Sequence, residues 1–582
     1  MSIIEFRDVS FTPLGEEGKN VRDISFHIKK GTVTVFLGDS QSGNSTVLGM
    51  LNRLVPCNIP GKLEGDIVVD GVNIVKTSAN LRDMATKIGF VLQQPDLQIV
   101  SLTVKGDITF GPQCLGYAVD EINKWSDFAI EAVRLKGFEV RNPKTLSGGE
   151  IQALAIGGVL AMNPKILAMV DPVAALDPMG KTRVYSILKH IRKEYGTTIL
   201  LSEPGMNIES ATEIADRIVV MSKGEIVADD APSKVFENEF AVRVGIPEVT
   251  QLFIKLRGKN RRLVPKLPAT LDDAERMTRQ LLEGKRIKTP ERTKVEVKKR
   301  REPIIRIKNL RHTFAAYPPV EALKGIDLEI YPGEFVGLIG NNGGGKSTLA
   351  LHLVGIWKPT NKDAEVIVDG LDVANKKTTI QEILPHINYV FQNPDVQLFC
   401  QTVEDEMAYG LQKLKKPAKE RESLIAAALK RFNIEAYRKQ YIMHLPRDVK
   451  TYLAEASVVA MDPKVLIIDE PTGGLDMDGA TLMMESLLGL NEAGKTIIII
   501  THDQKVVAKY CGRVIAMGQG NIILDGSTRE VYSQHKKLEE FQLAPPQITQ
   551  LGQRLSDLGF PDDVLSIDEM YDLITSNMIS RS

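Results

Sequence analysis

The sequence has few cysteines and no long hydrophobic run. Its 582 residues include four cysteines, and no two of them form a CxxC pair. This spacing disfavours a disulfide framework and a cysteine zinc site, so we expect the reduced thiols of a cytosolic protein. No apolar run approaches the roughly 18 residues of a membrane-spanning helix. Because the N-terminus also does not resemble a signal peptide, we expect any membrane association to be peripheral.

The chain also lacks an excess of charge of either sign. Lys and Arg number 73 and Asp and Glu 74, which gives a formal net charge of −1. This balance gives no support for a general nucleic-acid-binding protein, which needs a basic surface. The apolar fraction of 43% and the charged fraction of 25% are ordinary for folded domains, and the length allows several of them.

An internal repeat organises the chain. The run Val91-Leu-Gln-Gln-Pro-Asp-Leu-Gln98 matches Val390-Phe-Gln-Asn-Pro-Asp-Val-Gln397, and their glutamines Gln93 and Gln392 are 299 residues apart. A repeat of this length predicts two copies of one domain. We predict a first domain over 1–284 with a C-terminal extension from about 245, a charged linker over 285–302, and a second domain over 303–582 with an extension from about 543.

The linker prediction depends on composition. Residues 285–302 are rich in Lys, Arg and Glu and have no apolar periodicity, which is typical of a solvated connection. The basic run Lys298-Lys-Arg-Arg301 leaves open a contact with anionic lipid. The glutamates nearby dilute this charge, so we favour the simple linker.

The pattern of each copy predicts an α/β fold. Alternating stretches such as Ile326–Tyr331 indicate antiparallel strands, and Phe335–Ile339 indicates a buried strand that enters a glycine loop. The following ranges look helical: 104–160 and 403–459. Further core strands are expected at Lys165–Val170, Lys464–Ile468, Thr197–Leu201 and Thr496–Ile500. We therefore predict in each copy a mostly parallel core sheet, an antiparallel β subdomain and a helical subdomain.

The glycine loop of the second copy is a phosphate-binding motif. It reads Gly340-Asn341-Asn342-Gly343-Gly344-Gly345-Lys346-Ser347-Thr348 and fits the pattern GxxxxGK[ST] after a buried strand. Glycines let main-chain N–H groups surround phosphate oxygens, and the N-terminus of the next helix adds partial positive charge. Lys346 would contact the β- and γ-phosphates, and Ser347 could ligate magnesium.

Two carboxylates and a histidine follow the loop at the expected places. Asp469 and Glu470 end the apolar run Leu466-Ile-Ile, where the first is placed to hold Mg²⁺ and the second to polarise an attacking water. His502 comes directly after the next apolar strand. Gln392 and His502 are weak signals as isolated residues. The position of His502 after the strand that follows the carboxylates favours a functional role, and we also expect Gln392 to be a metal ligand.

These motifs together resemble the ATP-binding cassette (ABC) ATPases, and the resemblance covers both halves of the chain. It implies two ABC-type nucleotide-binding domains with ATP and Mg²⁺ as ligands, in which the loop of one domain faces a signature segment of the other. The signature in this chain is Ser147-Gly148-Gly149, which would cap the γ-phosphate of ATP held at Lys346. The resemblance also places Phe314 against the adenine, and Tyr317 is the alternative.

The first copy departs from the family pattern at many of these positions. Its loop keeps Gly38, Gly43, Ser45 and Thr46, but Asn44 replaces the lysine. The expected magnesium aspartate, catalytic glutamate and switch histidine are replaced by Val170, Asp171 and Glu203, Pro13 takes the adenine position, and the second copy has Arg447 and Asp448 in place of the signature glycines. If the copies pair head to tail, all losses fall in one composite site, which we expect to be degenerate. Residual nucleotide binding there stays open.

A narrower resemblance is to the ATPases of energy-coupling-factor (ECF) importers. It is carried by Thr103–Pro112, Thr402–Gly410, and the similar segments Ile246–Leu252 and Pro545–Leu551, each followed by a helical stretch, Leu271–Leu282 and Ile567–Thr575. The resemblance implies an ATPase module for uptake of a vitamin or a transition-metal ion. It would lie on the cytoplasmic face of the cell membrane, bound to a transmembrane coupling component and a substrate-binding component. Two alternatives are a soluble tandem ABC ATPase acting on ribosomes or DNA and a nucleotide-gated scaffold.

Overall fold

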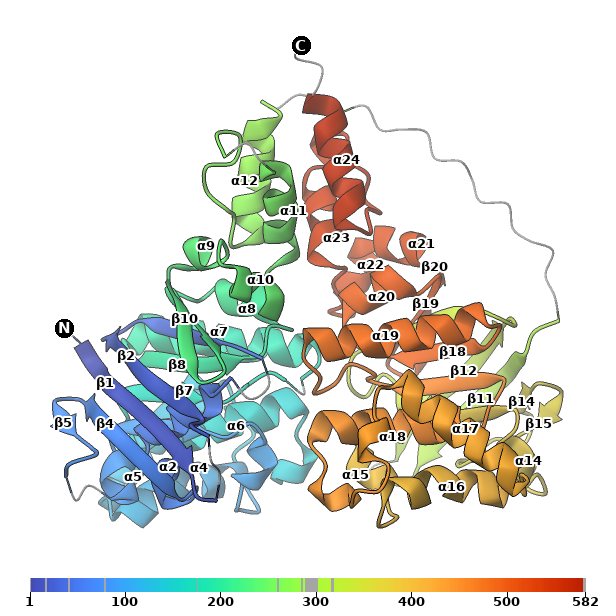
Figure 1. Ribbon diagram of the computed structural model, residues 1–582, viewed down its shortest axis with the longest axis horizontal. Coiled ribbons are helices and arrows are strands. Elements are labelled where there is room, and N and C mark those ends of the chain that lie inside the picture. The colour runs from blue at the N-terminus through green and yellow to red at the C-terminus, as the bar shows by residue number, and fades with distance from the viewer. Residues whose placement is uncertain are drawn as a thin grey trace. The chain divides into compact units, whose positions relative to one another are not determined.

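The computed structural model describes residues 2–15, 18–39, 42–77, 80–174, 176–258, 261–283, 286–287, 302–315 and 319–578 (Figure 1). The chain divides into two compact units. Unit 1 is formed mainly by residues 1–285 and unit 2 by residues 286–573.

Each unit contains a four-stranded and a six-stranded sheet. The sheets of unit 1 have the orders β2-β1-β4-β5 and β10-β9-β3-β8-β7-β6, and those of unit 2 have the orders β12-β11-β14-β15 and β16-β17-β18-β13-β19-β20. The strands of unit 1 are β1 Ser2–Pro13, β2 Val21–Lys29, β3 Val33–Leu37, β4 Gly61–Val69, β5 Val72–Asn73, β6 Ile88–Val91, β7 Ile166–Met169, β8 Thr198–Glu203, β9 Arg217–Ser222 and β10 Glu225–Asp230. Those of unit 2 are β11 Ile305–Phe314, β12 Val320–Ile330, β13 Phe335–Gly340, β14 Glu365–Val368, β15 Leu371–Asp372, β16 Ile387–Val390, β17 Val465–Asp469, β18 Thr496–Ile500, β19 Arg513–Gly518 and β20 Asn521–Ser527.

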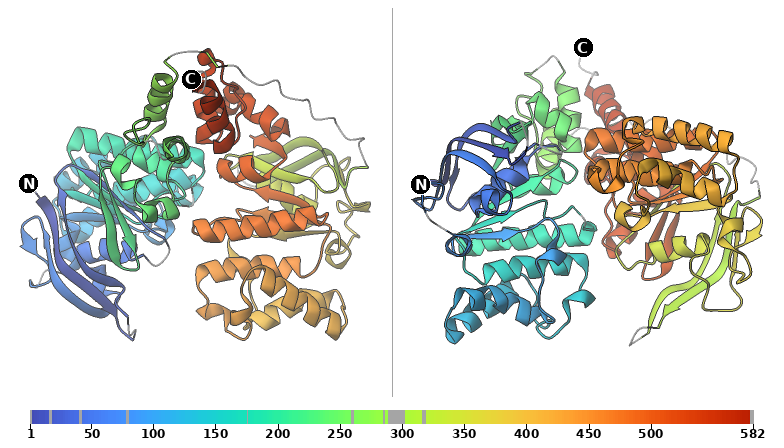
Figure 2. Two further views of the ribbon diagram at one scale, coloured as in Figure 1. Left: turned by 45° about the horizontal axis from the view of Figure 1, so that its top comes forward. Right: turned by 60° about the horizontal axis from the view of Figure 1, so that its bottom comes forward.

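The helices follow a similar sequence in the two units, although α2 has no counterpart in unit 2 and α15 stands where unit 1 has a 3-10 helix. Those before the linker are α1 Asn44–Leu51, α2 Leu54–Cys57, α3 Leu81–Ala85, α4 Val104–Leu115, α5 Val119–Ala132, α6 Gly148–Leu160, α7 Pro178–Tyr195, α8 Ile208–Thr212, α9 Pro232–Val235, α10 Glu239–Val244, α11 Glu248–Arg257 and α12 Leu271–Leu281. Those after it are α13 Lys346–Leu353, α14 Ile380–Ile383, α15 Pro394–Gln397, α16 Val403–Lys413, α17 Ala418–Arg431, α18 Arg447–Val459, α19 Met477–Glu492, α20 Gln504–Tyr510, α21 Thr528–Ser533, α22 His535–Glu540, α23 Gln547–Arg554 and α24 Ile567–Met578. In unit 2, helices α16–α18 and the antiparallel strands occupy separate sides of the core sheet in both views of Figure 2.

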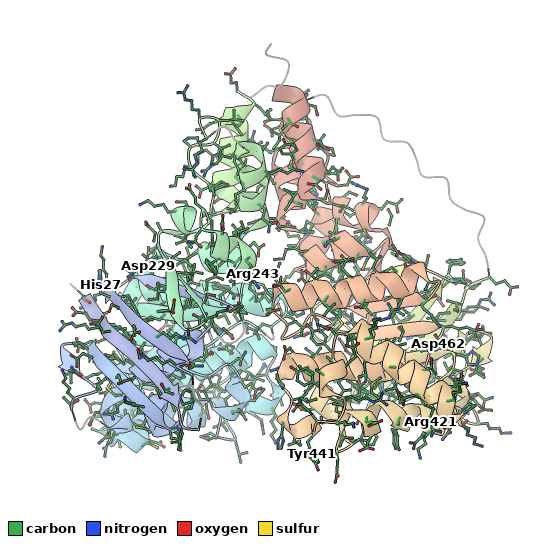
Figure 3. The ribbon with its side chains drawn as sticks, viewed as in Figure 1. His27, Asp229, Arg243, Arg421, Tyr441 and Asp462 are labelled. Carbon is green, nitrogen blue, oxygen red and sulfur yellow. The ribbon has the colours of Figure 1, made fainter. Side chains whose placement is uncertain are left out.

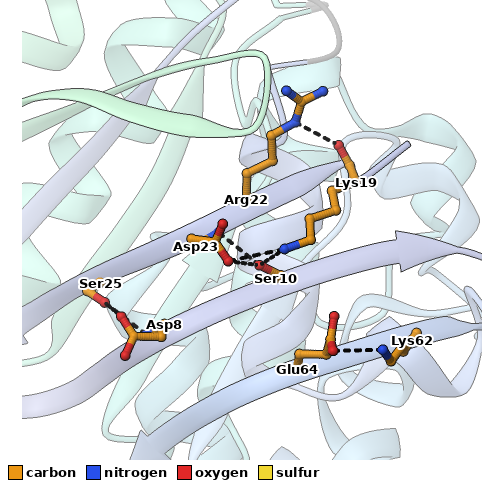
Figure 4. Close-up of polar contacts among 8 residues, drawn as sticks. All are labelled: Asp8, Ser10, Lys19, Arg22, Asp23, Ser25, Lys62 and Glu64. Carbon is orange, nitrogen blue, oxygen red and sulfur yellow. Dashed lines mark hydrogen bonds and ion pairs between the residues drawn. The ribbon is translucent and has the colours of Figure 1, made fainter. Parts of the chain in front are cut away.

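The antiparallel sheet of unit 1 is held by polar contacts between its long strands. Ser10 on β1 donates to Asp23 on β2 at 2.6 Å, and the ammonium of Lys19 lies 3.1 Å from both (Figure 4). A second contact in the same sheet joins Ser25 to Asp8 at 3.0 Å. These contacts lie where the β1–β2 register shifts, so side chains stabilise the pairing at its irregular part.

The core of each unit lies against the six-stranded sheet, whose strands are parallel except for the last pair, β9–β10 or β19–β20. In unit 2 the strands are almost fully apolar, as expected for a sheet covered on both faces. One face packs with Leu349 and Leu353 of α13, and the other packs with Met484 and Leu487 of α19. This arrangement places the start of α13 beside the carboxyl end of β17.

The structure confirms the predicted fold class in both units. The expected core strands appear as β7, β8, β17 and β18, and the expected helical ranges contain α4–α6 and α16–α18. Most of the predicted linker lies outside the described residues, including the basic run Lys298–Arg301. At its start, Ile287 is buried and its N–H donates to the carbonyl oxygen of Leu558 at 2.8 Å. No helix in the described ranges is both long and apolar enough to cross a bilayer.

Candidate functional site

The loop between β13 and α13 has the backbone of a phosphate-binding loop. Gly340, Gly343 and Gly345 have φ values of +152°, +76° and +98°. A side chain on Gly340 would collide with the carbonyl oxygen of Met517, and one on Gly345 would lie 2.7 Å from the carbonyl oxygen of Ala322. Only glycine fits these two positions, because they combine a positive φ with a close main-chain approach.

The lysine of the loop is held at the helix N-terminus. Lys346 is 9% exposed and is the first residue of α13. Its Nζ donates to the carbonyl oxygens of Gly340 at 2.6 Å and Asn341 at 3.0 Å. The positive charge therefore lies over the loop, where the α13 N-terminus also favours an anion. Asn342, Gly344 and Thr348 complete the predicted motif in the same turn.

Ser347 and Asp469 come together as the sequence predicts, with one additional partner. Ser347 Oγ donates to Asp469 Oδ2 at 3.0 Å, and the hydroxyl of Tyr389 donates to the same oxygen at 2.5 Å. Burial raises the pKa of Asp469, and the hydrogen bonds from Tyr389 and Ser347 act in the opposite direction. Sequence reasoning missed Tyr389, because a tyrosine in a core strand ordinarily indicates packing only.

The predicted general base and switch histidine are in direct contact. His502 Nδ1 lies 2.6 Å from Glu470 Oε1, and Thr501 Oγ1 donates to Glu470 Oε2 at 3.0 Å. Glu470 has a φ of +53°, an uncommon conformation that is typical of residues at functional sites. Thr501 was also missed from the sequence, where only the histidine after it carried a signal.

Two other predicted site residues, Gln392 and Phe314, lie in other elements of unit 2. Gln392 is exposed in the loop after β16. Phe314 is half-buried at the end of β11, where its ring meets the edges of His312 and Trp357 at centroid distances of 4.7 and 5.1 Å. The alternative adenine-stacking residue, Tyr317, lies outside the described residues.

The predicted signature forms a helix N-terminus within unit 1. Ser147 is the N-cap of α6, and its main-chain N–H donates to the Glu150 carboxylate at 2.8 Å, while its hydroxyl accepts from the Glu150 N–H. Gly148 and Gly149 begin the helix. A side chain on Gly149 would lie 2.7 Å from the Cα of Gly180, so this glycine also has a packing role between α6 and α7.

The corresponding segment of unit 2 has a different surface. Helix α18 starts at Arg447 after the N-cap Pro446, and both Arg447 and Asp448 are exposed in its first turn. The proline has no hydroxyl to offer, and two charged side chains stand where unit 1 has glycines. The start of α18 therefore presents a guanidinium and a carboxylate where the start of α6 presents two glycines.

The phosphate loop of unit 1 keeps its shape in part but lacks the charge. Gly43 has a φ of +98°, as Gly345 has in unit 2, and Ser45 and Thr46 follow in α1. Asn44 is buried, its Nδ2 lies 3.4 Å from the carbonyl oxygen of Phe36, and its Oδ1 has no hydrogen-bond partner among the described residues. Gly38 directly follows the preceding strand, β3. An amide in place of the lysine leaves this helix start without the cation that unit 2 has.

In unit 1, the residues at the positions of Asp469, Glu470 and His502 make different contacts. Val170 lies in the apolar core, where it offers no ligand. Asp171 accepts from Ser202 and from Gln93 Nε2, the latter at 3.2 Å, and burial raises its pKa. Glu203 instead accepts from the N–H groups of Asn207 at 2.9 Å and Gly205 at 3.2 Å. Burial raises the pKa of Glu203 to about 7.

Comparisons with known proteins identify the family of this chain. The profile of a family described as "ABC transporter" matches residues 21–174 and 323–473. A protein of Caldanaerobacter subterraneus subsp. tengcongensis named as an ABC transporter ATP-binding protein is 36% identical over 575 residues, which cover 97% of each chain. One from Methanosarcina acetivorans is 35% identical over 555 residues, covering 92% of this chain and 88% of its own.

Among solved structures, cbiO1 from Clostridium perfringens, described as part of the ABC transporter complex cbiONQ, is 34% identical and covers 44% of this chain and 98% of its own, with a TM-score of 0.38. The two long relatives and the two profile matches decide the assignment, since together they account for both units. The chain therefore belongs to the ABC transporter ATP-binding proteins and is an ABC-type ATPase with two tandem cassette domains, the ATP-binding subunit of an ABC transporter.

Proposed function

We propose that this chain is the energy-coupling ATPase of an ECF-type importer for a vitamin or a transition-metal ion. It would act on the cytoplasmic face of the cell membrane, bound to a transmembrane coupling component and a substrate-binding component. In this proposal one composite site hydrolyses ATP. Its loop and carboxylates come from unit 2 and its signature, Ser147-Gly148-Gly149, comes from unit 1.

The asymmetry of the two sets of residues supports a single competent site. In unit 2 a cation, a metal-type carboxylate and a carboxylate–histidine pair lie on one edge of the core sheet. In unit 1 the same edge carries an amide, a valine and two carboxylates whose partners are a serine, a glutamine and main-chain N–H groups. Phosphate binding needs positive charge and magnesium binding needs oxygen ligands, so only the first set suits ATP hydrolysis.

The residues of unit 2 fit a bound magnesium ion. Ser347 Oγ and Asp469 Oδ2 are hard oxygen donors that already meet at 3.0 Å, and Mg²⁺ is usually bound by one or two protein oxygens together with substrate phosphates. No cluster of three or more His, Cys, Asp or Glu side chains suited to a metal occurs in the described ranges. Substrate phosphates would supply further ligands. Bound magnesium would neutralise charge on the β- and γ-phosphates.

The protein groups can be assigned roles in hydrolysis. Lys346 would hold the phosphates, and Glu470 would accept a proton from the attacking water. His502, 2.6 Å from Glu470, would keep that carboxylate in place and reach toward the γ-phosphate. Ser147 and its following glycines would close the site from unit 1, with main-chain N–H groups at the α6 N-terminus.

The proposal of a membrane partner is supported by exposed apolar side chains. Three such positions recur 299 residues apart after each glutamine motif, with exposed fractions between 40% for Tyr409 and 72% for Leu97. The pairs are Leu97 and Val396, Val100 and Phe399, and Phe110 and Tyr409. Tyr441, 57% exposed, projects outward from the same region of unit 2 (Figure 3). Apolar groups exposed at matching places in both units are suited to bind a second protein.

Membrane fractionation tests the importer proposal. Cells that express the chain with and without its candidate transmembrane partner are separated into membrane and soluble fractions. We expect the chain in the membrane fraction only when the partner is present, and faster ATP turnover in the complex. High salt should leave this association mostly intact, because salt screens charge but not apolar contact. A chain that stays in the soluble fraction in both cells would favour the soluble tandem ATPase.

A further inference from the structure

We propose that Tyr389 is a positioning residue that holds the carboxylate of Asp469 in place for magnesium. The inference deepens the proposed function and depends on it, since the magnesium role of Asp469 is assigned there. The hydroxyl of Tyr389 donates to Asp469 Oδ2 at 2.5 Å, which is the shorter of the two hydrogen bonds on that oxygen.

The sheet register explains how Tyr389 reaches this carboxylate. Strand β16 runs parallel to β17, with Tyr389 paired to Ile467. Side chains alternate along a strand, so Ile467 and Asp469 lie on the same face of β17. Tyr389 packs with the core cluster on that face, which also contains residues of the helix α13 that follows the phosphate loop. Its ring therefore extends along the sheet toward the end of β17, where its hydroxyl meets Asp469.

The position of the tyrosine ring is itself fixed. Phe391 packs edge-to-face on it, with 4.8 Å between ring centroids. The main-chain N–H of Phe391 donates to Gln397 Oε1 at 3.1 Å, and Gln397 Nε2 donates to the carbonyl oxygen of Ala454 on α18 at 2.7 Å. The ring that packs on Tyr389 thus belongs to the residue just after β16, whose main chain is joined to α18 through Gln397. A donor held this firmly restricts the rotation of the carboxylate that it bonds.

Unit 1 has lost the donor and the acceptor together. Phe90 occupies the place of Tyr389 and Val170 the place of Asp469, and the strand pairing is the same, with Phe90 opposite Ala168. Val170 belongs to the apolar core, and Phe90 packs against that core. A tyrosine needed only for packing could stand beside a valine or an aspartate. The two units instead contain matched pairs, Tyr389 with Asp469 and Phe90 with Val170, which points to a role tied to the carboxylate.

Oxygen ligands of metals commonly depend on such hydrogen bonds. Groups that orient a ligand from behind change metal affinity or activity about 10–100-fold when they are removed. We therefore expect loss of the Tyr389 hydroxyl to weaken the magnesium-dependent part of nucleotide binding by about tenfold, while the magnesium-independent part stays the same.

The test measures ATP affinity with Mg²⁺ and with a chelator, in the full chain carrying Glu470→Gln to prevent turnover. Tyr389→Phe should reduce the gain in affinity that Mg²⁺ provides by about tenfold and leave the affinity in chelator unchanged. Phe90→Tyr is the matched control in unit 1 and should change neither value, since Val170 offers no acceptor. Thermal unfolding without nucleotide should be the same for Tyr389→Phe and its parent.

A third variant separates this inference from the proposed function. Asp469→Asn should lose most of the magnesium gain, and adding Tyr389→Phe to it should cause little further loss. If Asp469→Asn loses the gain while Tyr389→Phe keeps it, the positioning role is wrong and the proposed site stands. If Asp469→Asn keeps the gain, the proposed magnesium site itself is wrong. A Tyr389→Phe chain that unfolds earlier and binds ATP weakly even in chelator would assign Tyr389 a structural role only.

Discussion

At the scale of single residues, Glu470 of unit 2 and the corresponding Asp171 of unit 1 contact different groups. Glu470 accepts from Thr501 at 3.0 Å and lies 2.6 Å from His502. Asp171 accepts instead from Ser202 and Gln93. In the proposed function, the shorter side chain of Asp171 and the glutamate in place of the histidine would leave unit 1 without a base directed at a γ-phosphate.

The first prediction follows from Glu470 being the general base. Glu470→Gln should abolish hydrolysis while ATP still binds, because the amide keeps the shape of the side chain but accepts no proton. Steady-state turnover and nucleotide binding are measured on the same preparation, with Asp171→Asn as the matched change in unit 1. Asp171→Asn should keep most of the turnover. A Glu470→Gln chain that retained more than about a tenth of the rate, a barrier change under about 1.4 kcal/mol, would disprove the assignment.

The second prediction concerns the pH dependence of stability in unit 1. Burial raises the pKa of Glu203 to about 7 from its ordinary value of 4.5, the nearby Asp171 acts in the same direction, and Lys181 opposes it. Between pH 4.5 and pH 7, Glu203 therefore stays protonated in the folded state and is ionised in the unfolded state. This contribution to stability is complete below pH 4.5, declines as the pH rises, and is gone above pH 7.

Glu203→Gln should remove this dependence. Above pH 7 the variant should be more stable than the parent by about 3 kcal/mol in unit 1, and the difference should vanish toward pH 4.5. Thermal unfolding across this range measures it, with Glu213→Gln at an exposed position as a control that should shift little. Parallel curves for parent and Glu203→Gln at every pH would show that the buried carboxyl does not titrate in this range.

The sequence predicts a site residue where its side chain is of a type that is seldom needed for packing at that place in the fold. A lysine in a glycine loop and two carboxylates after an apolar strand rarely serve packing alone, so Lys346, Asp469 and Glu470 could be found without a structure. Tyr389 and Thr501 could not. A tyrosine and a threonine are ordinary in β-strands, and only the three-dimensional contacts reveal that their hydroxyls bond the two carboxylates.

At the scale of elements, the start of α6 combines a capping residue with a close helix–helix contact. Ser147 caps the helix, and Gly149 lies against Gly180 at the start of α7. A methyl group on Gly149 would lie 2.7 Å from the Gly180 Cα, which is main chain and has little room to move. The element that carries the proposed signature therefore also depends on this glycine for its position.

The third prediction follows from this contact. Gly149→Ala should lower the stability of unit 1 by about 1–3 kcal/mol, the usual cost of an added group in a packed place. Gly158→Ala in the same helix is the control, because a methyl group there would lie 3.8 Å from the Asp107 carbonyl oxygen, an ordinary contact distance. Alanine favours the helix there by up to about 1 kcal/mol. Equal unfolding temperatures for the two variants would show that the α6–α7 contact is loose.

Elements were predictable where one periodicity or one motif dominates. The apolar runs within β17 and β18 indicated buried parallel strands, and the loop motif marked the end of β13 and the start of α13. The order of strands in the sheets was not predictable in detail, since it depends on which strands pair across long separations. The contact of Ile287 with Leu558 was not predictable either, because it has no local sequence signal.

At the scale of the whole molecule, we propose that the two units share one working site. The units have the same strand order and different surviving residues, and each lacks parts that the other keeps. A protein with two independent sites would not be expected to retain an intact loop in one copy and an intact signature in the other. Crossed pairing of the two units accounts for this distribution most simply.

The fourth prediction tests the crossed pairing. Ser147→Arg lies in unit 1, yet it should abolish turnover at the loop of unit 2, because a large cation would replace the cap of the γ-phosphate. Arg447→Ala, at the corresponding helix start of unit 2, should change turnover by less than about twofold, since it belongs to the degenerate site. ATPase rates of both variants, with circular dichroism to verify folding, decide the matter. Equal loss of activity in both would argue for two working sites.

The most direct test of the single-site proposal counts bound nucleotide. Isothermal titration of the full chain carrying Glu470→Gln with ATP and Mg²⁺ gives the number of tight sites without interference from turnover. We expect one magnesium-dependent ATP per chain, lost on Lys346→Ala and kept when Asn44→Ala is introduced in unit 1. Two equally tight magnesium-dependent sites per chain would contradict the central claim that only unit 2 provides a competent phosphate and magnesium site.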